Sequence, residues 1–212
     1  MSSSTHFTKY QAQLWVWSSS HLREHRFLPF WIEKNIHFSN FDLDELELIG
    51  TSGEKISSGI GRVISSKAID IFPFPQIHFV ILGDNDLRPN RKNAKSCYET
   101  MEFFEELIKD FSNFSNSHLV ISSIIPSPLT DDVSRVKNNR MNILLNEAIK
   151  AEKCKRVSFM NITNNFIFEG EIRRTPFQLF DQDGIHLTST GAKLLADCLQ
   201  KHLEKLPKFL FS

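Results

Sequence analysis

Short runs of apolar residues alternate along the chain with longer segments in which apolar residues recur every three or four positions. The short runs predict buried strands, whereas the longer spacing is typical of helices that cover a sheet. We expect strands at 14–17, 45–49, 77–82, 119–125 and 157–162. We expect helices at about 20–34, 94–111, 131–150 and 189–206, and a short helix after the glycine- and serine-rich stretch 50–61.

Strands that alternate with helices in this way predict one parallel, doubly wound sheet with helices on both faces. We therefore expect a single three-layer α/β/α domain over residues 11–206, with a flexible N-terminus at 1–10 and a tail at 207–212. In such sheets, functional residues gather outside the carboxyl ends of the strands. The segments that follow the five strands are therefore where we expect a site.

The composition fits an ordinary globular domain. Hydrophobic residues make up 41% of the 212 residues and charged residues 24%, which allows a sizeable core. The 25 basic and 25 acidic residues balance, so the protein is not a polybasic binder of nucleic acids or membranes. We recognise neither a signal peptide nor a membrane span. Three cysteines without a C-x-x-C spacing favour a reducing compartment, so we expect an intracellular, cytoplasmic protein.

The loop before the closing helix contains Asp183 and His186, three positions apart. At this spacing one turn can bring the carboxylate to one imidazole nitrogen, which leaves the other nitrogen as a general base. Taken alone, the motif favours an ordinary surface turn, because short motifs of this kind are common.

Two further strand ends carry candidate residues. The strand at 77–82 runs into Gly83-Asp84-Asn85-Asp86, where glycine permits a tight turn and Asn85 can offer an amide N–H to an oxyanion. A simple polar turn is the alternative. The first strand ends in Ser18-Ser19-Ser20-His21, where a serine at a helix N-terminus either helps to bind an oxyanion or caps the helix. Gly53 lies in a glycine turn after the second strand.

In this order, the four segments resemble the four blocks of the SGNH hydrolases, the GDSL-type esterase and lipase family. That family has a nucleophilic serine after the first strand, a glycine after the second, Gly-x-Asn-Asp after the third, and Asp-x-x-His before the last helix. The matching positions here are Ser20, Gly53, 83–86 and 183–186, and the resemblance extends over about 14–202.

The first block differs from the family pattern, because Ser18 and Ser19 stand where the family has glycine and aspartate. Ser20-His21-x-Arg23 is similar to a eukaryotic branch that reads Gly-Asp-Ser-His-x-Arg and is often found in proteins derived from retroelements.

The resemblance implies the flavodoxin-like SGNH hydrolase fold and a serine carboxylic-ester hydrolase of the esterase, lipase, acetylesterase or thioesterase type. It implies that Ser20 attacks a small-molecule ester or acyl substrate, that His186 is the base and that Asp183 orients it. It further implies an oxyanion hole formed by the amides of Ser20 and Gly53 and the Asn85 side chain. Gly83, Asp86, Ser18, Ser19 and His21 complete the motifs, and the chemistry requires no cofactor or metal.

The alternative is a catalytically weak or inactive domain of the same fold that binds RNA or protein. Four basic residues follow the Gly-x-Asn-Asp block and can contact phosphates: Arg88, Arg91, Lys92 and Lys95. The zero net charge disfavours this interpretation. His21 and His25 have the spacing of two metal ligands on a helix, but Arg23 and Arg26 beside them would repel a cation. The sequence predicts neither the acyl group nor the oligomeric state.

Overall fold

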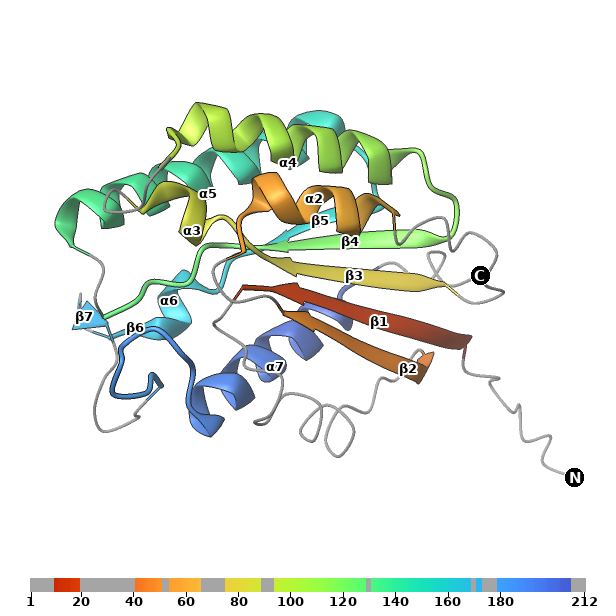
Figure 1. Ribbon diagram of the computed structural model, residues 1–212. Coiled ribbons are helices and arrows are strands. Elements are labelled where there is room, and N and C mark those ends of the chain that lie inside the picture. Colours follow the sequence, from red (N-terminus) through yellow and green to blue (C-terminus); the bar gives the residue numbers. More distant parts are fainter. Residues whose placement is uncertain are drawn as a thin grey trace, which may run out of the picture.

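The computed structural model describes residues 10–19, 41–50, 54–65, 75–88, 94–128, 131–168, 171–172 and 179–206. At its centre lies a five-stranded sheet of order β2-β1-β3-β4-β5, in which all neighbouring strands are parallel (Figure 1). The strands are β1 (Tyr10–Ser18), β2 (Phe41–Gly50), β3 (Gln76–Ile81), β4 (Ser117–Ser122) and β5 (Val157–Met160). The five predicted strands are therefore confirmed, and β1 and β2 are longer than the apolar pattern indicated.

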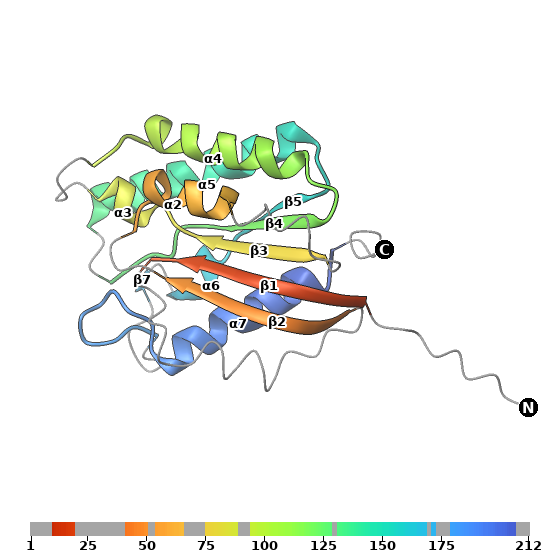
Figure 2. The same ribbon diagram turned by 45° about the vertical axis from the view of Figure 1, so that its right-hand side comes forward.

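Helices cover both faces of the sheet (Figures 1 and 2). One face carries α2 (Ile56–Ser65), α4 (Cys97–Ser112) and α5 (Asp132–Glu152), and the opposite face carries α7 (Ser189–Leu203). The three-layer α/β/α prediction is thus confirmed. The helix predicted at about 20–34 lies outside the described residues, as do 1–9 and 207–212. None of the described helices has the length and hydrophobicity needed to cross a membrane.

Four short elements were not predicted from the sequence, because each is too short to show a hydrophobic period. They are α3 (Asp84–Leu87), α6 (Thr163–Phe166), β6 (Ile167–Phe168) and β7 (Glu171–Ile172). The last two pair antiparallel, apart from the main sheet.

The mostly apolar sequence of β3 follows from its place in the sheet. The strand lies between β1 and β4, and every one of its residues is buried, including the polar Gln76 and His78. Ile77 and Phe79 pack in the core cluster that contains the apolar side of α7, whereas Val80 packs in the cluster with α2, α4 and α5. A strand that is covered on both faces has apolar residues on both, which explains the pattern.

The strand order also determines where a site can form. From the neighbouring strands β1 and β3 the chain winds outward in opposite directions, to β2 on one side and to β4 and β5 on the other. Such a switch point leaves a crevice at the carboxyl ends of the two strands. Ser18, the last residue of β1, is in register with Gly50 of β2 and Ile81 of β3. The carboxyl ends of these three strands therefore lie side by side.

Candidate active site

The turn after β3 has the geometry that its glycine predicts. Gly83 has φ 108°, a conformation that side chains disfavour, and a Cβ there would lie 3.3 Å from the Phe104 ring. The turn leads directly into α3, which carries Asn85 and Asp86. Both side chains are buried, so this polar turn is built into the body of the protein.

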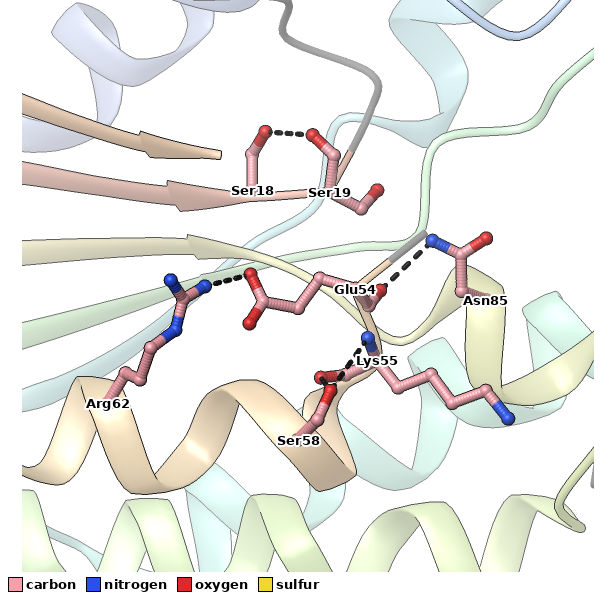
Figure 3. A network of polar contacts seen from close by, with 7 residues as sticks. All are labelled: Ser18, Ser19, Glu54, Lys55, Ser58, Arg62 and Asn85. Carbon is pink, nitrogen blue, oxygen red and sulfur yellow. Dashed lines mark hydrogen bonds and ion pairs between the residues drawn. The ribbon is translucent and has the colours of Figure 1, made fainter. Parts of the chain in front are cut away.

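Asn85 and Asp86 connect this turn to the start of α2. The Asn85 amide donates a hydrogen bond from Nδ2 to the carbonyl oxygen of Glu54 at 3.0 Å (Figure 3). Asp86 accepts hydrogen bonds from the Ile56 amide at 2.7 Å and from the Ser57 hydroxyl at 3.0 Å. Glu54 was not singled out in the sequence, because no spacing or motif signals a backbone acceptor. It directly follows Gly53, so the contact places Asn85 next to the second block.

The end of β1 lies beside this cluster. The Ser18 hydroxyl donates to the Ser19 carbonyl oxygen at 2.7 Å, and both serines are buried. In Figure 3 the Ser18 side chain points away from Asn85, whereas the Ser19 side chain points to the side on which Asn85 lies. Ser20, His21 and Gly53 lie outside the described residues. Their roles stay predictions, and their described neighbours Ser19 and Glu54 lie at this edge of the sheet.

The Asp183–His186 turn forms the expected carboxylate–imidazole pair. Asp183 Oδ1 accepts hydrogen bonds from the backbone amides of Ile185 and His186, both at 3.0 Å. Its Oδ2 is the partner of His186 Nδ1. A carboxylate only accepts, so Nδ1 carries the hydrogen and Nε2 is the basic nitrogen of the neutral ring. The turn can therefore present a general base.

The charge of Asp183 is stabilised by the same contacts. Burial raises the pKa of this carboxyl, but hydrogen bonds from the His186 amide and ring and from the Ile185 amide outweigh it. The pKa of Asp183 is consequently held well below its usual range. The carboxylate stays ionised at neutral pH and can stabilise a positive charge on the His186 ring.

Three contacts fix this turn at the carboxyl end of the sheet. The turn is closed by the Asp181 amide, which donates to the His186 carbonyl oxygen at 2.8 Å. The Ser127 hydroxyl, in the loop after β4, donates to the Gly184 carbonyl oxygen at 2.6 Å. Thr188 caps α7 by accepting the Gly191 amide at 3.2 Å. Because Ser127 follows the carboxyl end of β4, His186 lies at the same edge of the sheet as Asn85. The contribution of Ser127 was not predicted from the sequence.

The described basic residues of the loop after α3 have partners within the protein. Arg88 donates from Nε to Asp84 Oδ2 at 2.8 Å, and the Lys95 ammonium group lies 5.1 Å from the centre of the Phe103 ring. Arg91 and Lys92 lie outside the described residues, as do His21 and His25. Within the described part of the chain, no group of three or more His, Cys, Asp or Glu side chains could hold a metal ion. The three cysteines are free; Cys97 is buried, and Cys154 and Cys198 are half-buried.

The sheet order, with a Gly-x-Asn-Asp turn after β3 and an Asp-x-x-His turn before α7, defines the flavodoxin-like α/β/α class that SGNH hydrolases use. The sequence model of the family described as GDSL-like Lipase/Acylhydrolase matches residues 39–199, and the chain therefore belongs to this family. The matched segment contains Asn85, Asp183 and His186 and begins after Ser20. No curated protein sequence matches the chain.

Solved structures share the fold over nearly the whole chain. A member of the lipolytic protein G-D-S-L family from Veillonella parvula is 15% identical, with a TM-score of 0.65, over 92% of this chain and 100% of that one. The aryl esterase of M. smegmatis is 13% identical, with a TM-score of 0.66, over 92% and 100%. A Clostridium thermocellum family 3 carbohydrate esterase is 17% identical, with a TM-score of 0.63, over 91% and 94%. At these identities the likeness shows a common fold.

Proposed function

We propose that the protein is a serine carboxylic-ester hydrolase in which Ser20, His186 and Asp183 form the catalytic triad. The observation that carries the proposal is the hydrogen-bonded pair of Asp183 and His186, which leaves Nε2 of the ring as the base. Family membership supports it, because the matched segment includes both residues. A small-molecule ester or acyl compound is then the substrate, and no cofactor is needed.

In the proposed reaction, His186 Nε2 takes the hydroxyl proton of Ser20 while Oγ attacks the ester carbonyl carbon. The negative charge that develops on the carbonyl oxygen is stabilised by the amides of Ser20 and Gly53 and by Asn85. Collapse of this intermediate breaks the ester bond, and His186 gives its proton to the departing alcohol. Water then releases the acid from Ser20 by the same steps, with His186 again as base.

The hydrogen bond between Asn85 and Glu54 fits this role. A side-chain amide has two hydrogens, and one of them is directed at the Glu54 carbonyl oxygen. The bond fixes the rotamer of Asn85 and leaves the second hydrogen for the oxyanion. A donor that is held in place before the reaction costs no reorganisation in the transition state, which is what an oxyanion hole requires.

Three consecutive serines allow a matched test. We would measure hydrolysis of p-nitrophenyl acetate and longer p-nitrophenyl esters by the wild-type protein and by Ser18→Ala, Ser19→Ala and Ser20→Ala. Ser20→Ala is expected to lose activity by about 10⁴-fold or more, and the other two to keep most of it. Labelling with a fluorophosphonate, followed by peptide mapping, is expected to modify Ser20. Folded wild-type protein that neither hydrolyses these esters nor reacts with the probe would contradict the proposal.

Binding of RNA through the basic loop gains no support from the described residues, because Arg88 and Lys95 interact with Asp84 and Phe103. The cytoplasmic location also stays a prediction.

A further inference from the structure

Two adjacent residues of the β3 turn hold the chain at the start of α2 from both sides. Asn85 bonds to the carbonyl oxygen of Glu54, and Asp86 bonds to Ile56 and Ser57, two and three residues further on. The Asp86 side chain has no solvent exposure. The contacts span about thirty residues of sequence, since Asn85 and Glu54 are 31 positions apart. They join the second and third blocks of the site.

Asp86 serves as the N-terminal cap of α2 although it belongs to another element. The first amides of a helix have no partner inside the helix and need an acceptor from elsewhere. Lys55 directly precedes α2, and its side chain has no acceptor atom. Asp86 supplies the acceptor from α3, with Oδ2 on the Ile56 amide and Oδ1 on the Ser57 hydroxyl. The position of the first turn of α2 therefore depends on Asp86.

Glu54 is held at both of its ends. Its carbonyl oxygen accepts from Asn85, and its carboxylate forms an ion pair with Arg62, further along α2 (Figure 3). Gly59 makes this arrangement possible, because a Cβ at that position would lie 3.3 Å from the Glu54 carboxylate. The Glu54 side chain is 7% exposed. Any shift of α2 is thus transmitted to Glu54 and to the amide of Asn85.

We propose that Asp86 is a positioning residue for the oxyanion hole: by fixing the first turn of α2 it keeps Glu54, and through it Asn85, in the geometry that stabilises the transition state. The inference rests on the proposed ester hydrolysis, because it assigns Asp86 to the same site. Displacing a donor by about 1 Å can cost about 100-fold in rate, so a residue that only holds the donors matters for catalysis.

The role requires acceptor geometry rather than charge. Burial raises the pKa of Asp86, and the hydrogen bonds from Ile56 and Ser57 and the charge of Lys55 only partly oppose this. Asparagine can keep the two shorter contacts, since its Oδ1 can accept from the Ile56 amide while its Nδ2 donates to the Ser57 hydroxyl. It loses only the 3.5 Å contact from the Ser57 amide to Oδ1, whereas alanine removes all three contacts.

The test compares Asp86→Ala and Asp86→Asn with Asp131→Ala. Asp131 caps α5 by accepting the Ser134 amide at 2.7 Å, so its loss removes a helix cap of the same type that does not belong to α2. With a p-nitrophenyl ester, Asp86→Ala is expected to lower kcat about 10- to 100-fold and to change KM less than about twofold. Asp86→Asn is expected to keep kcat within about threefold, and Asp131→Ala within about twofold. A purely structural role would not separate kcat from KM or be rescued by asparagine.

The same variants are examined by hydrogen exchange, which does not depend on activity. Asp86→Ala is expected to speed amide exchange at 54–58, and Asp131→Ala only in the first turns of α5. The inference is overturned if Asp86→Ala leaves exchange at 54–58 unchanged, if its kcat matches that of Asp131→Ala, or if Asp86→Asn is as slow as Asp86→Ala.

If the wild-type protein hydrolyses no ester, the proposed function fails and so does the catalytic role of Asp86. Amide exchange still decides in that case whether Asp86 holds the start of α2. Should Asp86→Ala not fold, Ser57→Ala takes its place, and amide exchange at 54–58 is expected to be faster than in the wild type, whereas unchanged exchange would overturn the inference.

Discussion

The Ser127 hydroxyl donates a hydrogen bond to the Gly184 carbonyl oxygen at 2.6 Å and so ties the turn that carries Asp183 and His186 to the sheet. The residues are 57 positions apart, and Ser127 is 1% exposed, so water does not compete for the hydroxyl. The bond joins the loop after β4 to the turn between Asp183 and His186. It therefore helps to set the distance between the imidazole ring and the carboxyl edge of the sheet.

Replacing Ser127 by alanine is expected to let this turn move. We expect kcat for ester hydrolysis to fall about 10-fold and the free energy of unfolding to fall by about 1–2 kcal/mol. Ser112→Ala is the control, because the Ser112 hydroxyl also donates to a carbonyl oxygen, that of Ile108 within α4, at 2.8 Å. Steady-state kinetics and urea denaturation of both variants check this. An equal drop in kcat in both variants would argue against a role for the Ser127–Gly184 bond.

Asp183→Asn is expected to change the tautomer of the His186 ring while it keeps a side chain of the same shape at position 183. An asparagine can present its amide to Nδ1, which favours the ring tautomer with the hydrogen on Nε2, the wrong one for a base. We expect kcat to fall about 10³- to 10⁴-fold. Asp181→Asn, a change of the same type in the same loop, is expected to alter kcat only a few-fold. Comparable losses in the two variants would mean that the Asp183–His186 pair does not act as proposed.

The dependence of ester hydrolysis on pH is expected to have a simple acid limb. The hydrogen bonds to Asp183 hold its pKa well below the usual range despite the opposing effect of burial, so this carboxylate stays ionised in mild acid. In the proposed reaction His186 is the single base, and it must be neutral to accept the proton of Ser20. Activity should therefore fall on acidification with the slope of one proton. A profile of kcat/KM against pH tests this, and a two-proton slope would contradict it.

The sequence predicts the central strands and long helices because each leaves a helical period or a mostly apolar run, as β3 does. It also predicts Asn85, Asp183 and His186, because fixed spacings within one turn bring chemistry together locally. Glu54 and Ser127 could not be predicted in the same way. The first acts through its backbone carbonyl and the second donates to a backbone carbonyl, over 31 and 57 positions. Such contacts depend on how loops meet in space, and no local pattern encodes that.

Two glycines in helices offer a test of packing beside the site. A Cβ on Gly191, in the first turn of α7, would lie 2.2 Å from the carbonyl oxygen of Leu179, whereas one on Gly61 in α2 would meet nothing within 4 Å. Gly191→Ala is expected to destabilise the protein by about 2–3 kcal/mol, because the backbone of Leu179 must move. Gly61→Ala is expected to stabilise it by about 0.5–1 kcal/mol, since alanine favours helix. Thermal or urea denaturation measures both, and a Gly191→Ala protein as stable as the wild type would contradict the close approach.

At the opposite end of the sheet, Ser158 of β5 links the buried His118 to the half-buried His202. Its hydroxyl lies 2.9 Å from His118 Nε2 and 2.8 Å from His202 Nε2. A hydroxyl has one hydrogen and two acceptor lone pairs, so at most one ring can accept from it and at least one ring must donate to it. Among the described residues, His118 Nδ1 is buried without a partner. A hydrogen there would be an unpaired donor, so we assign the donating Nε2–H to His118 and the accepting nitrogen to His202.

This arrangement needs both rings neutral and predicts loss of stability in mild acid. Burial lowers the pKa of His118 to about 3 and that of His202 to about 4. The charges of His202 and Arg156 lower the pKa of His118 further, and that of Lys205 lowers the pKa of His202 further. Histidines of the unfolded chain take up protons near pH 6.5, so below that value the unfolded state binds more protons than the folded state, and stability falls as the pH decreases. Each such histidine is expected to remove about 2 kcal/mol between about pH 7.5 and pH 5.

Urea denaturation at the two pH values, for the wild type and for His202→Gln, measures this loss. Glutamine keeps an oxygen that can accept from Ser158 but cannot take up a proton, so the variant is expected to lose about 2 kcal/mol less than the wild type on acidification. His78, whose pKa burial also lowers to about 3, contributes equally in both proteins, and the difference therefore reports His202. The same acid loss in both proteins would show that His202 is not kept neutral by the fold.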